Sequence, residues 1–76
     1  MVYKKMFGDT IYRLRKEKRM SQSELGTLLG IGGKAVGKWE SHEECPGITL
    51  LPILVQLLDD TEGDLFLHYY DFVGVA

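Results

Sequence analysis

The basic side chains are the residues of this chain that most clearly indicate a ligand, because lysine and arginine can bind phosphate. The 39 residues up to Trp39 hold all nine basic residues against three acids, a net charge of +6; the last 37 hold eight acids and no lysine or arginine. The net charge of −2 therefore hides a strong dipole, and the local field decides where a phosphate backbone can approach. Part of the run from Arg13 to Arg19 is also expected to be the solvated face of a helix. The basic residues are Lys4, Lys5, Arg13, Arg15, Lys16, Lys18, Arg19, Lys34 and Lys38.

The other reactive residue types form no recognisable metal or catalytic site. His42 and Cys45 are three positions apart with no second pair of ligands, so they cannot close a tetrahedral metal site. His42 and His68 lie in unrelated segments, and Ser21 is needed as a helix cap, so no nucleophile, base and orienting group can be placed together. We therefore expect no enzyme activity, no metal, no cofactor and no small-molecule substrate.

Length and composition indicate one domain over residues 1–76, with a core at about 7–69 and a tail, or the start of a linker, at 70–76. Hydrophobic residues make up 45% and charged residues 26%, which argues against disorder. No apolar stretch reaches the roughly 18 residues of a membrane span, and the N-terminus lacks the apolar region of a secretory signal. Together with a single cysteine, these features favour a cytoplasmic protein.

Short helices are the elements that must position the basic residues. An apolar stripe predicts a first helix over residues 7–18. Residues 21–24 read S-Q-S-E, a capping box in which serine and glutamate satisfy backbone N–H groups, so a second helix begins there. Gly30 is placed to end that helix in the left-handed conformation. The predicted buried positions are Phe7, Ile11 and Leu14 in the first helix and Leu25, Leu28 and Leu29 in the second.

A third helix is predicted from Gly33 to Trp39 or Glu40. Glycine at position 32 is tolerated as its cap but is less favourable than serine or threonine. Gly33 and Gly37 each cost up to about 1 kcal/mol relative to alanine inside a helix, so tertiary packing must hold this segment. The side chains expected to face inward are Ala35, Val36 and Trp39.

Two further helices complete an all-α prediction. Thr49 is predicted to cap a fourth helix, in which Pro52 falls in the first turn. Residues 61–64 read T-E-G-D, a second capping-box pattern that predicts a fifth helix. The apolar positions are Leu51, Leu54, Val55 and Leu58 in the fourth helix and Leu65, Phe66 and Tyr69 in the fifth.

The segment from Ser21 to Glu40 places two short amphipathic helices around the turn at residues 29–32, which is the spacing of a helix-turn-helix DNA reader. With this helix order, residues 7–67 resemble the phage-repressor type of helix-turn-helix protein, the XRE family. The matching residues outside the turn are Ala35, Val36, Lys38, Trp39, Glu40, Pro46, Ile48, Leu50, Leu51, Pro52, Asp64 and Leu65, a pattern typical of a bacterial branch. The resemblance implies a compact five-helix domain whose second and third helices form the motif.

The resemblance also implies which residues meet DNA. The second helix would cross the DNA backbone, with Gln22 and the neighbouring N–H groups on a phosphate, because a helix N-terminus suits an anion. The third helix would lie in the major groove. Lys34 is equally suited to guanine and to phosphate, whereas phosphate is favoured for Lys38. The implied DNA-binding positions are Gln22, Gly32, Gly33, Lys34, Gly37 and Lys38.

Other matched positions imply scaffold and assembly roles. Arg15 and Glu40 would form a planar, bidentate ion pair that ties the first helix to the end of the third. Gly26 stands where relatives usually have alanine, and Trp39 is expected in the core. The fifth helix of relatives commonly pairs with its twofold mate, which implies a dimer contact through Phe66, Tyr69 and Tyr70.

Two departures from the family pattern shape the functional hypothesis. The glycines remove most hydrogen-bonding side chains from the reading helix, so specificity should be modest or come from DNA shape and phosphate placement. In the loop after this helix, Glu43 and Glu44 would repel a phosphate. We favour a homodimeric, sequence-specific transcriptional regulator, a repressor, on double-stranded DNA. The alternative is an antitoxin-like or antirepressor-like protein-interaction module of the same fold.

Overall fold

The computed structural model describes residues 4–61 and 63–73, with side chains for 7–61 and 63–69. These residues form five α-helices, preceded at the fourth by a 3-10 turn. The elements are α1 (Lys4–Glu17), α2 (Gln22–Leu29), α3 (Gly33–Glu40), η1 (Ile48–Leu50), α4 (Leu51–Leu57) and α5 (Asp64–Val73). The described part of the chain contains no strand, so the predicted all-α class is confirmed.

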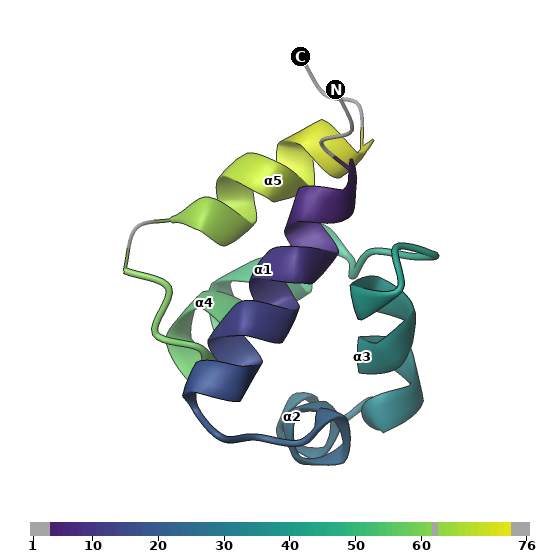
Figure 1. Ribbon diagram of the computed structural model, residues 1–76, viewed down its shortest axis with the longest axis vertical. Coiled ribbons are helices and arrows are strands. Elements are labelled where there is room, and N and C mark those ends of the chain that lie inside the picture. Colours follow the sequence, from purple (N-terminus) through teal and green to yellow (C-terminus); the bar gives the residue numbers. More distant parts are fainter. Residues whose placement is uncertain (1–3, 62, 74–76) are drawn as a thin grey trace.

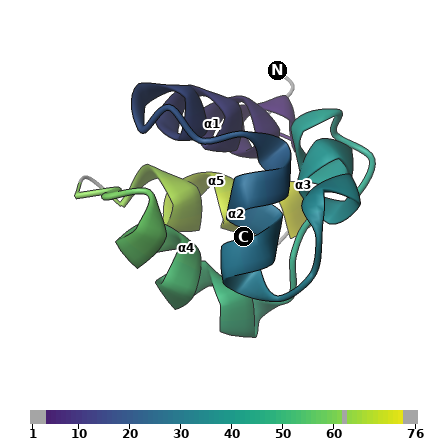
Figure 2. The ribbon, with the colours of Figure 1, turned by 90° about the horizontal axis from the view of Figure 1, so that it is seen from below.

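Helix α1 lies along one side of the molecule: it crosses the front of the view in Figure 1 and runs along the upper edge in Figure 2. It packs along α5, while α2 and α3 pack against each other. From below, α5 lies between α1 and α4 (Figure 2). Side chains from all five helices meet in one core, made of Phe7, Ile11, Leu14, Leu25, Val36, Trp39, Leu51, Leu54, Leu58, Leu65 and Tyr69. This core holds α2 and α3 against α1 without a sheet.

One predicted core position is wrong. Leu28 is 58% exposed, whereas Leu25 and Gly26 are buried. Because α3 packs on Gly26, the buried face of α2 is centred between positions 25 and 26. At about 100° per residue, Leu28 then lies roughly 110° from that centre, on the outer side of the helix.

The predicted cap of α4 is also wrong. Thr49 lies inside η1, and Leu50 occupies the cap position of α4 with no side-chain hydrogen bond. The 3-10 turn takes the place of a side-chain cap, because the N–H of Leu51, at the start of α4, donates to the carbonyl of Ile48. Pro52 falls in the first turn of α4, as predicted.

The start of α5 differs from the predicted Thr61 capping box. The carboxylate of Asp60 accepts from the N–H groups of Asp64 and Leu65 at 3.2 and 2.8 Å. Asp60 is 5% exposed, and Gly63 (φ +75°) turns the chain so that the first turn of α5 reaches it. The helix then continues to Val73, so residues 70–73 are helical; residues 74–76 lie outside the described part.

The capping box of α2 is confirmed and makes a pH-dependent contribution to stability. Ser21 Oγ accepts from the N–H of Glu24 at 2.9 Å, and the Glu24 carboxylate accepts from the N–H of Ser21 at 2.8 Å. That backbone bond, and then the serine hydroxyl, lower the pKa of Glu24 below its ordinary value of 4.5. A lowered folded-state pKa stabilises the protein above the ordinary value, and the contribution is lost as pH falls through the folded-state value.

We expect Glu24→Gln to keep stability near neutral pH, because glutamine can complete the same capping box. Urea unfolding between pH 7 and pH 3 should show a flatter decline in the variant than in the parent. Glu17→Gln, which removes a carboxylate outside the cap, should leave the decline unchanged. Parallel curves for Glu24→Gln and the parent would contradict the assignment.

Candidate nucleic-acid interface

Helices α2 and α3 approach each other closely because glycines line their contact. A Cβ atom at Gly26 would lie 2.1 Å from the carbonyl carbon of Gly32, and one at Gly33 would lie 2.8 Å from Cα of Ser23. The first turn of α3 therefore lies directly on the first turn of α2. This chain brings the two helices closer than the alanine expected at position 26 in relatives would allow.

The turn between the two helices is fixed by backbone geometry. Gly30 ends α2 in the left-handed conformation (φ +76°), as predicted, and Gly32 begins α3 at φ +86°. The N–H groups of Ile31 and Gly32 both donate to the carbonyl of Gly26, at 2.9 and 3.1 Å. Side chains other than glycine rarely adopt positive φ, so this turn requires glycine at 30 and 32.

The N-termini of both helices keep backbone donors available. In α2 the capping box uses the N–H groups of Ser21 and Glu24, and those of Gln22 and Ser23 have no acceptor in the described part of the chain. In α3 no side chain caps the first turn. Because free N–H groups and the helix dipole attract anions, the adjoining first turns of α2 and α3 form a surface suited to phosphate.

A buried ion pair holds this surface on α1. The Arg15 guanidinium donates to both Glu40 oxygens, at 2.7 and 2.9 Å, and to the carbonyl of Met20 at 2.8 Å. Both charged side chains are only 7% exposed, and the Glu40 bond raises the pKa of Arg15. This is the pairing that the family resemblance implies, and it joins α1, the α1–α2 connection and the end of α3.

Gln22 shares this pair. Its amide nitrogen donates to Glu40 at 3.0 Å, and its amide oxygen lies 3.4 Å from the position of a Cβ at Gly37. The side chain is therefore held across α3, close to the free N–H groups at the start of α2. Its exposed position suits the phosphate contact expected of it, but its orientation is set by Glu40.

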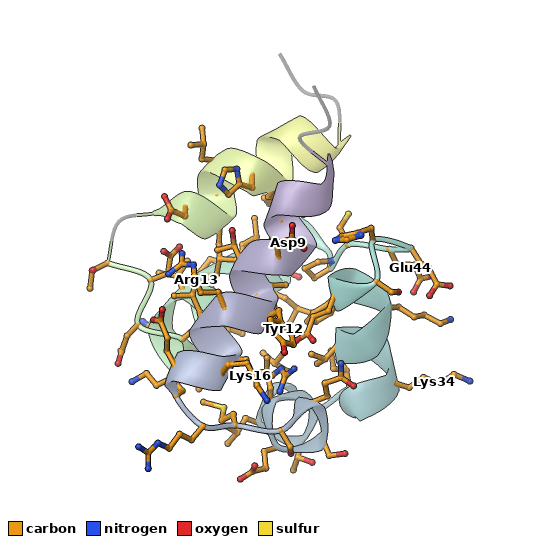
Figure 3. The ribbon with its side chains drawn as sticks, in the orientation of Figure 1. Asp9, Tyr12, Arg13, Lys16, Lys34 and Glu44 are labelled. Carbon is orange, nitrogen blue, oxygen red and sulfur yellow. The ribbon has the colours of Figure 1, made fainter. Side chains whose placement is uncertain are left out.

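The two lysines of α3 lie on its outer side. Lys34 is exposed and points away from α1, as Figure 3 shows. No carboxylate of the described residues lies within 4.0 Å of it. Lys38 Nζ lies 3.9 Å from Glu44 in the loop after α3. Lys34 is thus the unneutralised cation of this helix, and Lys38 is partly neutralised.

The matched glycines occupy two kinds of environment. Gly33 and Gly37 face α2, against Ser23 and Gln22, so they are part of the contact between helices. Gly32 has no atom within 4 Å of a Cβ position and is exposed. Of these three, Gly32 is the one whose backbone faces open space.

The fold redistributes the charge dipole of the sequence. Arg13 pairs with Asp64 at 3.5 Å and with Glu17 at 3.3 Å, and Lys18 pairs with Asp59. The acidic C-terminal half thereby neutralises the side of α1 that faces α5. Among described side chains, the cations without a carboxylate within 4.0 Å are Lys16, Arg19 and Lys34.

Sequence reasoning missed the tether of the loop after α3. His42 adopts φ +71°, and its Nε2 lies 3.0 Å from Asp9 Oδ1 on α1. The N–H groups of Glu43 and Glu44 bond to the carbonyl of Lys38, which fixes the loop at the end of α3. Asp9 and His42 are 33 positions apart in the sequence, so no local pattern indicates this contact.

The expected dimer residues differ in exposure. Tyr69 is 7% exposed, with its ring 5.7 Å from that of Phe7, so it belongs to the core and offers little surface to a second subunit. Phe66 is half-buried, and its neighbour Leu67 is 60% exposed. The side chain of Tyr70 lies outside the described part. A twofold contact on α5 would therefore use Phe66 and Leu67 among described side chains.

Within residues 4–61 and 63–73, no three His, Cys, Asp or Glu side chains gather as metal ligands. None of the described helices is both long and apolar enough to cross a membrane.

Two short helices joined by a glycine turn, with adjoining N-termini and a lysine-bearing second helix, define a helix-turn-helix module. A family model described as Helix-turn-helix matches residues 11–66, so the chain belongs to this family, in its XRE or phage-repressor type. At the family level these domains are DNA-binding transcription regulators. No curated protein and no solved structure matches the chain.

Proposed function

We propose that this protein is a sequence-specific DNA-binding repressor that acts as a homodimer in the cytoplasm and places α3 in the major groove. The observation that carries the proposal is that the first turns of α2 and α3 lie side by side, with backbone N–H groups available, next to Lys34. Phosphates would bind to the N–H groups of Gln22 and Ser23 and to Lys38. Lys34 would reach a guanine edge or a flanking phosphate.

The glycines of α3 support a protein that makes few direct hydrogen bonds to bases. Gly33 and Gly37 carry no side chain to donate or accept, and Gly32 offers only backbone. Base discrimination by direct contact would then rest on Lys34, with groove shape and phosphate placement supplying the rest. Two copies would place their α3 helices in half-sites about one helical turn, roughly 34 Å, apart.

Fluorescence anisotropy with random and genomic duplexes at 50 mM salt tests this function. The proposal expects binding at or below about micromolar protein, weakening steeply as salt increases. Folded protein that binds no duplex at micromolar concentration would favour the second candidate, a protein-interaction module. The exposed Leu28 on α2 and Ile31 in the turn, both within the motif, are the observation that favours that candidate.

The acidic loop should weaken DNA binding, because Glu43 and Glu44 lie at the end of α3 and Glu44 competes with phosphate for Lys38. We expect Glu43→Gln/Glu44→Gln to tighten binding to a duplex about five- to tenfold at 50 mM salt. Glu17→Gln/Asp59→Asn removes the same charge from exposed positions away from α3 and should change binding much less. Equal gains in both double variants would mean that net charge alone matters.

A further inference from the structure

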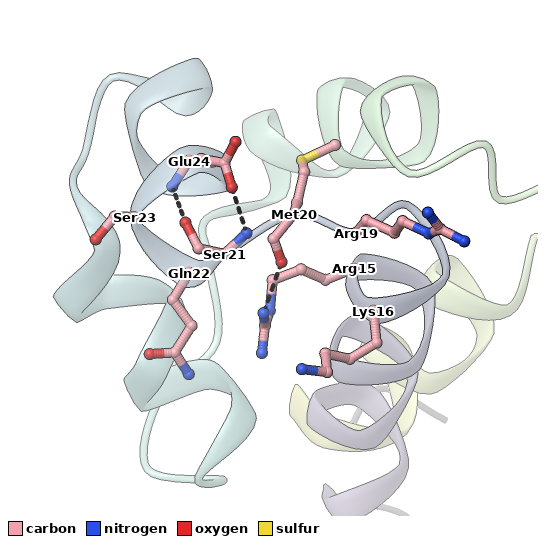
Figure 4. Close-up of a pocket in the computed structure, with 8 residues that line it drawn as sticks. All are labelled: Arg15, Lys16, Arg19, Met20, Ser21, Gln22, Ser23 and Glu24. Carbon is pink, nitrogen blue, oxygen red and sulfur yellow. Dashed lines mark hydrogen bonds between the residues drawn. The ribbon is translucent and has the colours of Figure 1, made fainter.

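A cleft of about 720 Å³ separates the end of α1 from the start of α2. Arg15 and Lys16 line it from α1, Arg19 lines it from the connection after α1, and residues 21–24 line it from the start of α2 (Figure 4). The wall on α2 includes Gln22 and Ser23, whose N–H groups have no acceptor in the described chain. The cleft therefore joins the proposed phosphate surface to a second set of cations, which the family resemblance does not assign to DNA.

Lys16 gives one end of this cleft its net positive charge. Arg15 is neutralised by Glu40, whose carboxylate it grips with two hydrogen bonds. Glu24 turns to the other side of Ser21, where its capping bond holds it, while Lys16 and Gln22 point to the Arg15 side, as Figure 4 shows. With no described carboxylate within 4.0 Å, the Lys16 ammonium is available to an anion.

Tyr12 orients Lys16. The Lys16 ammonium lies 5.8 Å from the centre of the Tyr12 ring, and the Arg15 guanidinium carbon lies 5.3 Å from the same centre. Cations within about 6 Å of an aromatic face are attracted by the ring quadrupole. The ring is half exposed, so it holds the lysine along α1 without burying its charge. This limits the conformations that Lys16 must lose on binding.

We propose that Lys16, positioned by Tyr12, is a second phosphate anchor on α1. A DNA phosphate has two unesterified oxygens: one would accept from the α2 N-terminus, and the other would face the Lys16 ammonium across the cleft. The inference rests on the proposed DNA binding and deepens it. The protein would then contact the DNA phosphate backbone from both α1 and α2, and these contacts would compensate for the sparse base contacts of α3.

Duplex affinity measured against salt tests this anchor. Lys16→Gln is expected to weaken binding about tenfold at 50 mM salt, as for one lost charged hydrogen bond, and to reduce the slope of log K against log salt by about 0.9. Lys18→Gln removes the same charge from the Asp59 pair and is the matched control, with little change in slope. Lys16→Arg should restore the slope, and Tyr12→Leu should lower affinity while keeping the slope.

Unfolding curves for the four variants separate binding from stability. If the parent binds DNA and Lys16→Gln matches it in affinity and slope, the α1 anchor is wrong while the proposed function stands. If Lys16→Gln and Lys18→Gln lose the same amount, the effect is one of net charge and the anchor is also wrong. If the parent binds no duplex, the anchor and the proposed function are both contradicted.

Discussion

Arg15→Met is expected to lower the free energy of unfolding by about 3–5 kcal/mol, because it leaves the Glu40 carboxylate buried without its counter-ion. Glu40 would retain only the Gln22 amide, and the carbonyl of Met20 would lose its guanidinium donor. A domain of this size has a total stability of about 4–11 kcal/mol, so the variant should keep only about −1 to 8 kcal/mol and should unfold at a much lower urea concentration than the parent. Urea unfolding followed by circular dichroism measures the change.

A double-mutant cycle distinguishes the buried charge from lost packing. Arg15→Met/Glu40→Leu replaces the pair with apolar side chains, and should recover a large part of the stability that Arg15→Met loses. Arg13→Met, which breaks only exposed pairs, should cost at most about 1 kcal/mol. If Arg15→Met unfolds at the same urea concentration as the parent, the pair does not hold α3 on α1.

Lys34→Ala/Lys38→Ala is expected to weaken binding to duplex DNA about 100-fold at 50 mM salt and to reduce the salt slope by about 1.8. Lys34 points outward from α3, toward the side where the proposed complex places the DNA, and has no described carboxylate within 4.0 Å, while the Lys38 side chain is 42% exposed. Arg13→Ala/Lys18→Ala removes equal charge from Arg13 on α1 and from Lys18 just after it, which pair with Asp64 and Asp59, and serves as the control. Retained affinity in the α3 variant would contradict the role of these lysines.

The single variants separate base reading from phosphate binding. If Lys34 contacts guanine, Lys34→Ala relaxes the preference at one base pair, whereas a phosphate contact weakens all sequences alike. Lys38→Ala is expected to act uniformly.

The sequence predicted the motif well because its signals are local. The capping box at 21–24, the left-handed Gly30 and the bounds of α3 each follow from residues a few positions apart. The Arg15 and Glu40 pairing came from the resemblance to a family, since 25 positions separate the two residues. Core positions on α1 and α3 followed from helical spacing.

Long-range packing accounts for what the sequence did not predict. The close contact of Gly26 with α3 rotated the buried face of α2, so Leu28 became exposed. Asp60, and not Thr61, caps α5, because Gly63 turns the chain so that the first N–H groups of the helix reach the Asp60 carboxylate. The sequence placed all basic residues in the first 39 positions, but it did not show which of them the acidic residues neutralise. Lys18, for example, is paired with Asp59 only in the folded chain.

The candidate interface was foreseen in part. The lysines and Gln22 were identified from the motif, but the glycines of α3 were matched to reading positions without revealing that Gly33 and Gly37 support the contact with α2. Lys16 and Tyr12 are four positions apart on α1, a spacing that places them on one face. Their relation to the start of α2 depends on the chain path through residues 18–21, which no periodicity specifies.

Selection of bound sequences from a random duplex pool at low salt tests whether the protein binds specific DNA sequences as a dimer through α3. Dimeric, sequence-specific binding predicts an enriched palindrome with two half-sites about one helical turn apart, with few strongly specified base pairs in each half. Folded protein that enriches no sequence, or enriches only unpaired single sites, would contradict it.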